Sequence, residues 1–308
     1  MKRIFLSGFA AAIALSSFAQ NPDKALARVR YTFIHIEDTT QKDKPRTENM
    51  LLVTGNNASV YTSYDKLNQT INLQKQLQEQ IKNQAGSGSQ TIKIESKSSK
   101  PITQIDYFFF ANEHKMITKE RLLNNYLVEE ASPVIDWKIT KDTMSFSGVH
   151  CQKATTHFKG RNWIAWFATD IPFQSGPWKL NGLPGLIVEA YDDKKEVQFQ
   201  FAGLDKVTAT ESPKEEKSEI AGMTVKMVGL DSGNDYLGDE IKLPADAIKT
   251  TRKELDKLKA ARDKDPDGFM QAQMAANGIN GSFKSTTTRT PGAPKKETNN
   301  PIELPEKK

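Results

Sequence analysis

Cysteine is nearly absent from this sequence, which has a single one, Cys151, among 308 residues. A disulfide needs two cysteines, so no disulfide can form within the chain. A chain of this length can bury a hydrophobic core without cross-links. Cys151 itself is interpreted as a small buried hydrophobe, and the alternative is a reactive or partner-linked thiol.

Long hydrophobic runs are also missing. A membrane-spanning helix needs about 20 apolar residues, and the apolar run at residues 4–15 is shorter. This run follows Lys2 and Arg3 and precedes a small residue, Ala19, which is the pattern of a cleavable secretory signal over residues 1–19. No cysteine stands at the expected cleavage site, so no lipid anchor is predicted there. We therefore expect a periplasmic or secreted protein, without an integral membrane segment after signal removal.

Neither sign of charge dominates. The sequence has 43 Lys and Arg against 38 Asp and Glu, a net charge of +5, and its basic residues are dispersed. Nucleic-acid binding needs a clustered basic surface, so nucleic acid is not expected as a partner. The apolar fraction is only 37%, which predicts that a good share of the chain is solvated loop or tail.

Familiar catalytic motifs are absent as well. No Gly-x-Ser-x-Gly, His-Glu-x-x-His or phosphate-binding glycine loop occurs. Ser63 and Lys66 match the Ser-x-x-Lys spacing of penicillin-interacting enzymes, but the companion motifs Ser-Asp-Asn and Lys-Thr-Gly are missing, so we treat the match as coincidence. No catalytic residue and no cofactor are predicted. Whether the protein is an enzyme stays open, with the balance against it.

The histidines and the cysteine do not predict a metal site. His150, Cys151 and His157 are the metal-type residues that cluster in sequence. In a strand, neighbouring side chains point to opposite faces and each residue advances by about 3.3 Å, so His157 would lie about 20 Å beyond His150. His35 or His114 could complete a site across a sheet, but structural histidines are the simpler interpretation.

What the sequence does contain is a turn that leads into a strand, within residues 176–189. Leu183 opens a Leu-Pro-Gly-Leu sequence in which Pro184 fits the type II turn position with φ near −65° and Gly185 fits the position with positive φ. Gly182, Pro184 and Gly185 are therefore predicted to be structural turn residues.

Two alternating segments follow, residues 186–191 and 196–201, separated by an Asp-Asp-Lys-Lys turn. Alternation of period two predicts an antiparallel hairpin with one apolar face. If the loop pairs Tyr191 with Glu196, the facing pairs are Ala190 with Val197, Val188 with Phe199 and Leu186 with Phe201.

The same region carries a family resemblance. Residues 182–187 read Gly-Leu-Pro-Gly-Leu-Ile, the hexapeptide that names the GLPGLI family of exported bacterial proteins. Residues 151–156, 165–172 and 300–304 also resemble this family, which usually has Tyr at the position of Phe167. The family is uncharacterised, so the resemblance implies an exported β-rich protein and brings no known activity, ligand or catalytic residue.

Strand-like composition recurs along the rest of the chain. The predicted strands are residues 26–36, 49–53, 58–63, 91–95, 104–110, 115–118, 125–130, 136–139, 149–158 and 162–169. A helix is predicted over about residues 65–84, and its apolar stripe should lie against the sheet. This stripe is formed by Leu67, Ile71, Leu73, Leu77 and Ile81. A flexible Gly-Ser linker follows at residues 86–89.

These elements predict the fold class and the domain organisation. Residues 20–242 should form an α+β domain, mostly β, with a single curved antiparallel sheet or half-open barrel and one helix packed on it. Residues 243–277 should form a charged helical extension, with Pro244 in a first helical turn. Residues 278–308 should form a mostly disordered tail, in which residues 301–304 could dock as an extended piece.

Large aromatic residues crowd the segment before the turn. The candidate ligand-binding residues are Trp163, Trp166, Phe167 and Trp178. A curved sheet with a helix across it makes an apolar cleft that would suit a lipid-like or peptide ligand. The alternative is packing, because Trp163 and Phe167 share one strand face and Trp166 lies on the other, so the rings would fill both sides of the sheet.

Three functions are compatible with the sequence. The first is a non-catalytic periplasmic binding or carrier module with an apolar cleft. The second is an envelope protein that binds a partner protein through a strand edge or through the C-terminal helix. The third, a hydrolase or metalloenzyme, has the least support.

Overall fold

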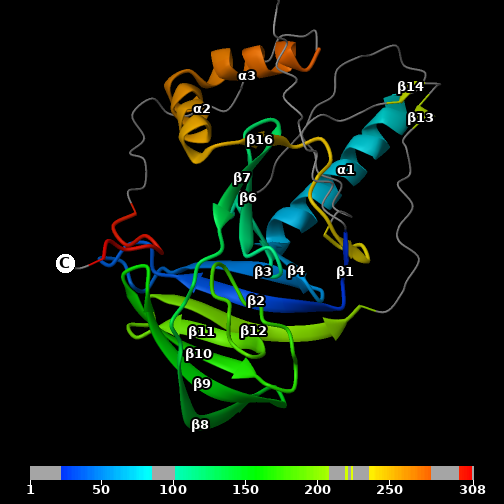
Figure 1. Ribbon diagram of the computed structural model, residues 1–308. Coiled ribbons are helices and arrows are strands. Elements are labelled where there is room, and N and C mark those ends of the chain that lie inside the picture. Colours follow the sequence, from blue (N-terminus) through cyan, green and yellow to red (C-terminus); the bar gives the residue numbers. More distant parts are fainter. Residues whose placement is uncertain are drawn as a thin grey trace, which may run out of the picture.

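The computed structural model describes residues 22–84, 101–207, 219–220, 223–224, 236–278 and 298–306 (Figure 1). The predicted signal at residues 1–19, the linker at residues 86–89, the strand at residues 91–95 and residues 279–297 of the predicted tail lie outside the described residues. Of the helices described, none combines the length and the apolar character that crossing a membrane would require.

One large sheet dominates the described part of the chain. Its twelve strands have the order β16-β7-β6-β5-β4-β3-β2-β12-β11-β10-β9-β8. Their bounds are β2 (Ala27–His35), β3 (Arg46–Thr54), β4 (Ala58–Ser63), β5 (Asp106–Phe110), β6 (Lys115–Arg121), β7 (Asn125–Ala131), β8 (Lys138–Phe146), β9 (Val149–Phe158), β10 (Arg161–Ala168), β11 (Leu186–Asp192), β12 (Val197–Lys206) and β16 (Ile248–Thr250). Two small sheets pair β1 (Asp23–Lys24) with β15 (Glu240–Ile241) and β13 (Glu219–Ile220) with β14 (Met223–Thr224).

The prediction of a mostly β fold is confirmed, but the large sheet is mixed. β16 runs parallel to β7, whereas the other neighbouring strands pair antiparallel. The end strands β8 and β16 are not neighbours, so across the described ranges the sheet is not closed into a barrel. In Figure 1, β6 and β7 stand above β2 and β3, and β8 to β11 lie below them.

The parallel strand lies where the sequence predicted the start of a helix. α2 (Arg252–Lys264) begins only after Thr251, whose side chain accepts a hydrogen bond from the backbone N–H of Glu254 while the Glu254 carboxylate accepts one from the backbone N–H of Thr251. This capping box fixes the first turn and leaves β16 free to pair with β7. Leu255 of α2 is buried against β7, and α3 (Pro266–Ala276) follows with no buried residue.

α1 (Tyr64–Gln84) follows β4 directly, as predicted, but its predicted stripe is only partly packed. Leu67 is buried in the core, whereas Ile71 and Leu73 are half-buried, and the side chains of Leu77 and Ile81 lie outside the described residues. In Figure 1, α1 rises from the end of β4 and away from the sheet. Polar residues separate the apolar ones along this helix, so little apolar area holds it against the strands.

Apolar side chains are buried on both faces of the sheet. The larger cluster includes Tyr31, Leu52 and Phe199, together with the aromatic residues of β10. The second cluster includes Val53 and Phe108. Because Leu52 and Val53 are neighbours in one strand, the two clusters lie on opposite faces of the sheet.

A buried ion cluster lies on the face of the second core. The Asp106 carboxylate accepts hydrogen bonds from the Lys66 ammonium at 2.5 Å, the Thr62 hydroxyl at 2.6 Å and the Tyr236 hydroxyl at 2.8 Å. The buried Lys119 ammonium lies 3.2 Å from the same carboxylate. Burial alone would raise the pKa of Asp106, but Lys66 and Lys119 outweigh it and lower the pKa to about 2.

The predicted hairpin of β11 and β12 is present with a different register. Ala190 pairs with Phe199 and Tyr191 with Gln198, a shift of two residues from the predicted pairs. A shift of two keeps every side chain on its face, so Val188 and Phe199 belong to the same core cluster. The physical reason for the shift is Asp192, whose side chain accepts a hydrogen bond from the backbone N–H of Val197 and closes the loop one residue later.

The prediction of a type II turn with positive φ at Gly185 is wrong. Positive φ occurs instead at Gly182, with φ 85°, and at Trp178, with φ 56°. The backbone N–H of Gly185 donates to the carbonyl of Leu183 at 2.8 Å, which is a three-residue turn around Pro184. A Cβ at Gly185 would lie 2.1 Å from the Ala168 carbonyl oxygen, so this position needs glycine for close approach.

Candidate functional site

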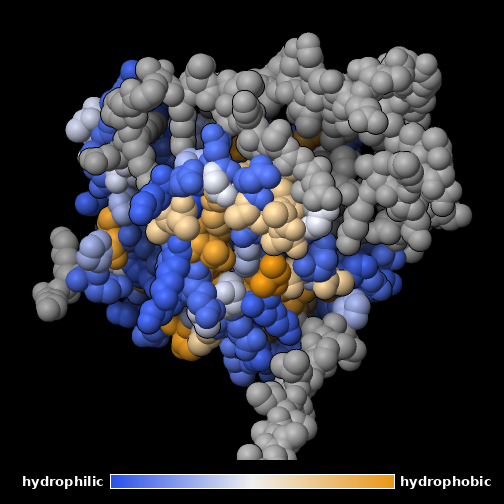
Figure 2. Space-filling model, turned by 90° about the horizontal axis from the view of Figure 1, so that it is seen from above, coloured by the Kyte–Doolittle hydropathy of each residue, from blue (hydrophilic) through white to orange (hydrophobic). Residues whose placement is uncertain are grey.

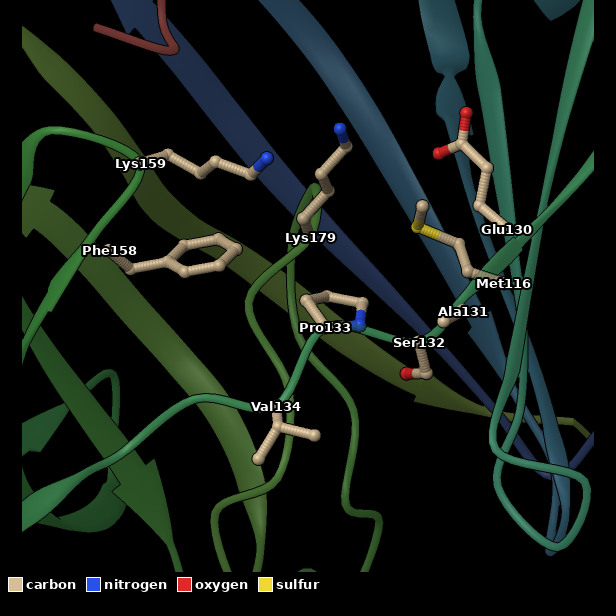
Figure 3. A pocket seen from close by; sticks show the side chains of 9 residues that line it. All are labelled: Met116, Glu130, Ala131, Ser132, Pro133, Val134, Phe158, Lys159 and Lys179. Atoms are coloured by element: carbon tan, nitrogen blue, oxygen red, sulfur yellow. The ribbon is translucent and has the colours of Figure 1, made fainter. Parts of the chain in front are cut away.

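An open pocket lies where β7 ends, beside the turn between β9 and β10. Its volume is about 340 Å³, near the lower limit of ligand pockets. Its lining residues are Met116, Glu130, Ala131, Ser132, Pro133, Val134, Phe158, Lys159 and Lys179. Lys159 and Phe158 face Glu130 and Met116 across the pocket, and Lys179 lies between them (Figure 3). We call this set of residues the lysine pocket.

Backbone geometry places the two lysines at the rim. Lys159 and Gly160 have φ of 53° and 71° and form the tight turn that joins β9 to β10. Lys179 follows Trp178, the other positive-φ residue of this region. The Lys179 ammonium lies 5.9 Å from the centre of the Tyr107 ring and 6.0 Å from that of Trp178, so aromatic faces hold it in place.

Both lysines bind one carboxylate. Glu303 lies 2.6 Å from the Lys179 ammonium and 3.4 Å from the Lys159 ammonium. Partial burial alone would raise the pKa of Glu303, but Lys179 and Lys159 outweigh it and lower the pKa below its ordinary value. Glu303 therefore carries a negative charge at neutral pH, and it comes from the C-terminal segment, far from the lysines in sequence.

A second set of charges includes Glu130, the acidic residue of the pocket lining. Arg252 of α2 donates to Glu120, to Glu130 at 3.0 Å and to the Thr118 hydroxyl at 2.8 Å. Tyr107 lies between the two sets of charges. Burial raises its pKa, and the charges of Glu303 and Glu120 raise it further. The pocket lining thus combines apolar residues with side chains of both signs of charge, which suits the binding of a ligand with a charged group.

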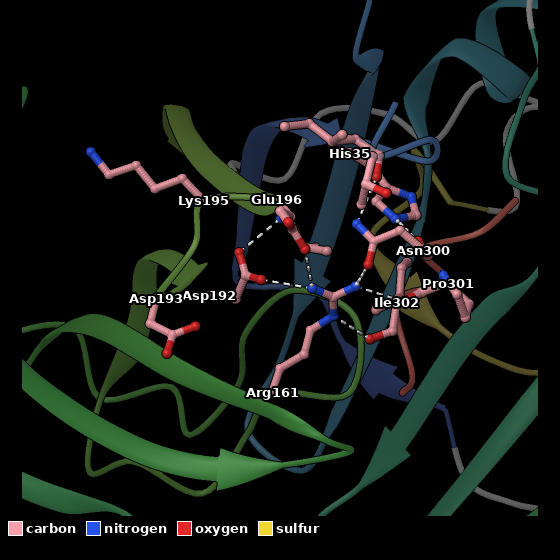
Figure 4. A network of polar contacts seen from close by, with 12 residues as sticks. His35, Arg161, Asp192, Asp193, Lys195, Glu196, Asn300, Pro301 and Ile302 are labelled. Carbon is pink, nitrogen blue, oxygen red and sulfur yellow. Dashed lines mark hydrogen bonds and ion pairs between the residues drawn. The ribbon is translucent and has the colours of Figure 1, made fainter. Parts of the chain in front are cut away.

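A tail clasp holds the C-terminal segment next to this pocket, and we define it as His35, Arg161, Asp192, Asn300 and Ile302 (Figure 4). The buried guanidinium of Arg161 donates to the Asp192 carboxylate at 2.7 Å, to the Asn300 side-chain oxygen at 2.6 Å and to the Ile302 carbonyl at 2.7 Å. His35 Nε2 lies 2.7 Å from the Asn300 carbonyl, so it must be the donor. Residues 301–304 dock as predicted, but they are not extended, because the backbone bends at Ile302 and Glu303.

The four aromatic residues predicted as ligand contacts are all buried in the large core. The Trp163 ring lies 5.6 Å from that of Trp178 and 6.1 Å from that of Phe199, and the Trp166 ring lies 5.9 Å from that of Phe146. None of the four lines the lysine pocket. They support it indirectly, because Trp178 packs at 5.9 Å on Phe158 of the pocket wall.

The metal-type residues are spread over the structure. His35 is buried in the tail clasp, and burial lowers its pKa. His150 and His157 are exposed, and Cys151 is buried, where desolvation and then Glu189 raise the pKa of its thiol to about 11. Within the part of the chain that the structure describes, no three His, Cys, Asp or Glu side chains form a group that could hold a metal ion.

Sequence reasoning missed the lysine pocket. Lys159, Lys179 and Glu303 lie far apart in sequence and share no common motif, and only folding brings them together. The available signal was the expected docking of residues 301–304, which contain Glu303.

Comparisons with known proteins give distant similarities. Two solved structures titled "Structure of PNGF-II", in the P21 and C2 space groups, match with 13% and 15% identity and TM-scores of 0.41 and 0.39. Each match covers 61% of this chain but only 30% and 29% of the PNGF-II chains, so this chain spans less than a third of their length. The comparison with curated proteins gives no match. Residues 54–189 of the chain match the model of a family described as "Protein of unknown function (Porph_ging)".

Proposed function

We propose that this protein is an exported protein of the GLPGLI family that works as a non-catalytic binding module in the periplasm or outside the cell. The signal-like residues 1–19 and the GLPGLI hexapeptide support export and family, and the match to a family of unknown function agrees with an uncharacterised role. The observation that carries the binding role is the lysine pocket, where the ammonium groups of Lys159 and Lys179 converge on one carboxylate beside an open cavity.

The electrostatics of the pocket favour binding over proton transfer. An efficient general acid or base has a pKa near the working pH, whereas the lysines hold the pKa of Glu303 below its ordinary value. The Glu130 carboxylate is paired with Arg252 at 3.0 Å. Charges that are held in ion pairs have fixed positions, which suits the recognition of a charged ligand. We therefore assign the pocket a role in ligand binding.

The ligand that the proposal names is a lipid-like or peptide molecule with an anionic group. Its charge would bind at the lysines, and its apolar part would lie against Met116, Phe158 and Val134. Val134 is 97% exposed, so it is open to contact with a ligand.

Native mass spectrometry of the protein purified from its own periplasm tests the proposal. We expect a bound small molecule or peptide, and we expect Lys179→Met to lose it. Lys194→Met is the matched control, because Lys194 is an exposed lysine on the hairpin loop outside the pocket and its variant should retain the ligand. A wild-type protein that carries no ligand, or equal loss in both variants, would contradict the proposal.

A second candidate function is partner binding through the C-terminal helices. α3 has no buried residue, although it carries Phe269, Met270 and Met274, which are half-buried. Seen from above, the face that includes these helices shows apolar residues between hydrophilic ones (Figure 2). An affinity pulldown with Met270→Lys would detect this function, because partner capture would fall while ligand in the lysine pocket stays bound.

A further inference from the structure

The C-terminal segment presents a carboxylate to the lysine pocket in the manner of a ligand. Glu303 reaches both Lys179 and Lys159, and its own side chain is 40% exposed. The Lys179 side chain is only 14% exposed and is held over two aromatic rings. The Lys179 ammonium is thus fixed and mostly buried, whereas the Glu303 carboxylate is accessible to solvent. Another anion can therefore take the place of this carboxylate at Lys179.

The same segment is anchored elsewhere, so Glu303 can leave without release of the whole segment. Asn300 is 4% exposed and its side chain donates to the Ile36 carbonyl at 2.7 Å and accepts from Arg161 at 2.6 Å. Hydrogen bonds to a buried charged group are among the stronger ones. The tail clasp is therefore the permanent attachment, and the contacts of Glu303 and Leu304, which lie outside it, are the exchangeable ones.

The mode of binding of the segment favours a peptide over a lipid. Its backbone is recognised directly outside the tail clasp, because Leu304 donates its N–H to the Lys159 carbonyl at 3.0 Å. A lipid chain has no groups for such contacts. Gly160 admits the segment, because a Cβ there would lie 2.5 Å from the Leu304 carbonyl oxygen.

We propose that the lysine pocket binds a short acidic peptide, whose carboxylate takes the place of Glu303 between Lys159 and Lys179, so that the C-terminal segment of the protein competes with its ligand. This inference rests on the proposed function. It names an acidic peptide as the ligand class and the C-terminal segment as the part of the protein that controls access to the lysine pocket. Loss of the Glu303 charge should open the site, and loss of the Lys179 charge should abolish it.

Fluorescence anisotropy on the full-length protein tests the inference with a dye-labelled peptide, acetyl-Ile-Glu-Leu-Pro amide, which copies residues 302–305. Glu303→Gln should bind this probe about tenfold more tightly than wild type, a change of about 1.4 kcal/mol. Lys179→Met added to Glu303→Gln should remove that gain. A probe with Gln in place of Glu should bind neither protein.

Glu306→Gln is the matched control, because Glu306 lies in the same segment but contacts His157 and the backbone N–H of Gly160 instead of the lysines. Its affinity for the probe should stay within about twofold of wild type. Equal affinities for wild type and Glu303→Gln, or an equal gain in Glu306→Gln, would overturn the inference. A thermal melt of each variant shows that the fold is retained.

Two outcomes separate this inference from the proposed function. If the protein from its own periplasm carries a ligand but the peptide does not bind Glu303→Gln, the competition is wrong and the binding role stands. If dodecanoate displaces the peptide from Glu303→Gln at equal concentration, the site prefers a fatty acid and the peptide assignment is overturned. If neither ligand nor peptide binds, both proposals fail.

Discussion

Gly185 shows how a single residue can be required for a reason that the sequence does not reveal. The Pro-Gly pair predicts positive φ at this glycine, but positive φ is found at Gly182. What Gly185 supplies is the absence of a side chain where the backbone passes the Ala168 carbonyl. Positive φ and close approach of the backbone would each require glycine at this position. The two explanations differ in the loss of unfolding free energy that they predict for alanine.

We predict that Gly185→Ala lowers the free energy of unfolding by about 2 to 3 kcal/mol, because the added Cβ collides with backbone that cannot move away easily. Gly182→Ala should cost about 1 kcal/mol, since only the positive φ opposes it and its Cβ would meet open space. Urea unfolding of the two variants gives both numbers. Equal losses, or a larger loss at Gly182, would refute the close-approach explanation.

At the scale of elements, hydrogen bonds of Asn300 tie the C-terminal segment to the large sheet. Asn300 contacts His35 of β2 and Ile36 just after it, and Arg161 of β10 contacts Asn300. Removal of the Asn300 side chain leaves the buried Arg161 guanidinium and the Ile36 carbonyl each without one hydrogen-bond partner.

Asn300→Ala should therefore lower the free energy of unfolding by about 2 kcal/mol, a typical cost for buried polar groups that lose their hydrogen bonds. Asn299→Ala is the control, because Asn299 is exposed and bonds only to the surface loop at Asp38 and Thr39, and its cost should stay below about 0.5 kcal/mol. Chemical denaturation of both variants checks the difference. Similar costs for the two would mean that the clasp does not stabilise the fold.

At the same scale, the sequence predicts elements better than it predicts their pairing. Alternation in β11 and β12 identifies both strands and the apolar face, because burial of one face imposes a period of two. The register depends on one side chain, Asp192, which no periodicity marks. The lysine pocket was unpredictable for a related reason: Lys159, Lys179 and Glu303 are single charged residues whose proximity exists only in the fold.

The whole molecule carries a built-in sensitivity to acid through the buried Asp106. Its pKa is about 2 in the folded protein and lies near 3.8 ordinarily. A lowered carboxylate pKa gives stability that is complete above the ordinary value and is lost as the pH falls towards the folded value. The expected loss is about 2 kcal/mol between pH 5 and pH 2.

Urea unfolding of the wild type at pH 5 and at pH 2.5 should show this loss. In Asp106→Asn the protein should be less stable at pH 5, and the part of the acid sensitivity that comes from Asp106 should disappear. Asp142→Asn, which removes an exposed carboxylate on β8, should leave the acid sensitivity as in wild type. An unchanged pH dependence in Asp106→Asn would contradict this assignment.

The tail clasp also constrains the order in which the molecule can be completed. The Asn300 side chain bonds to the Ile36 carbonyl across 264 positions of the sequence, so nearly the entire polypeptide must be available before the contact forms. Until residues 300–302 dock, Arg161 of β10 keeps its bond to Asp192 but lacks the acceptors that Asn300 and Ile302 provide. A chain that stops before residue 300 would leave the Arg161 guanidinium paired with Asp192 but without its acceptors at Asn300 and Ile302, so shortening the C-terminal segment has a cost inside the core.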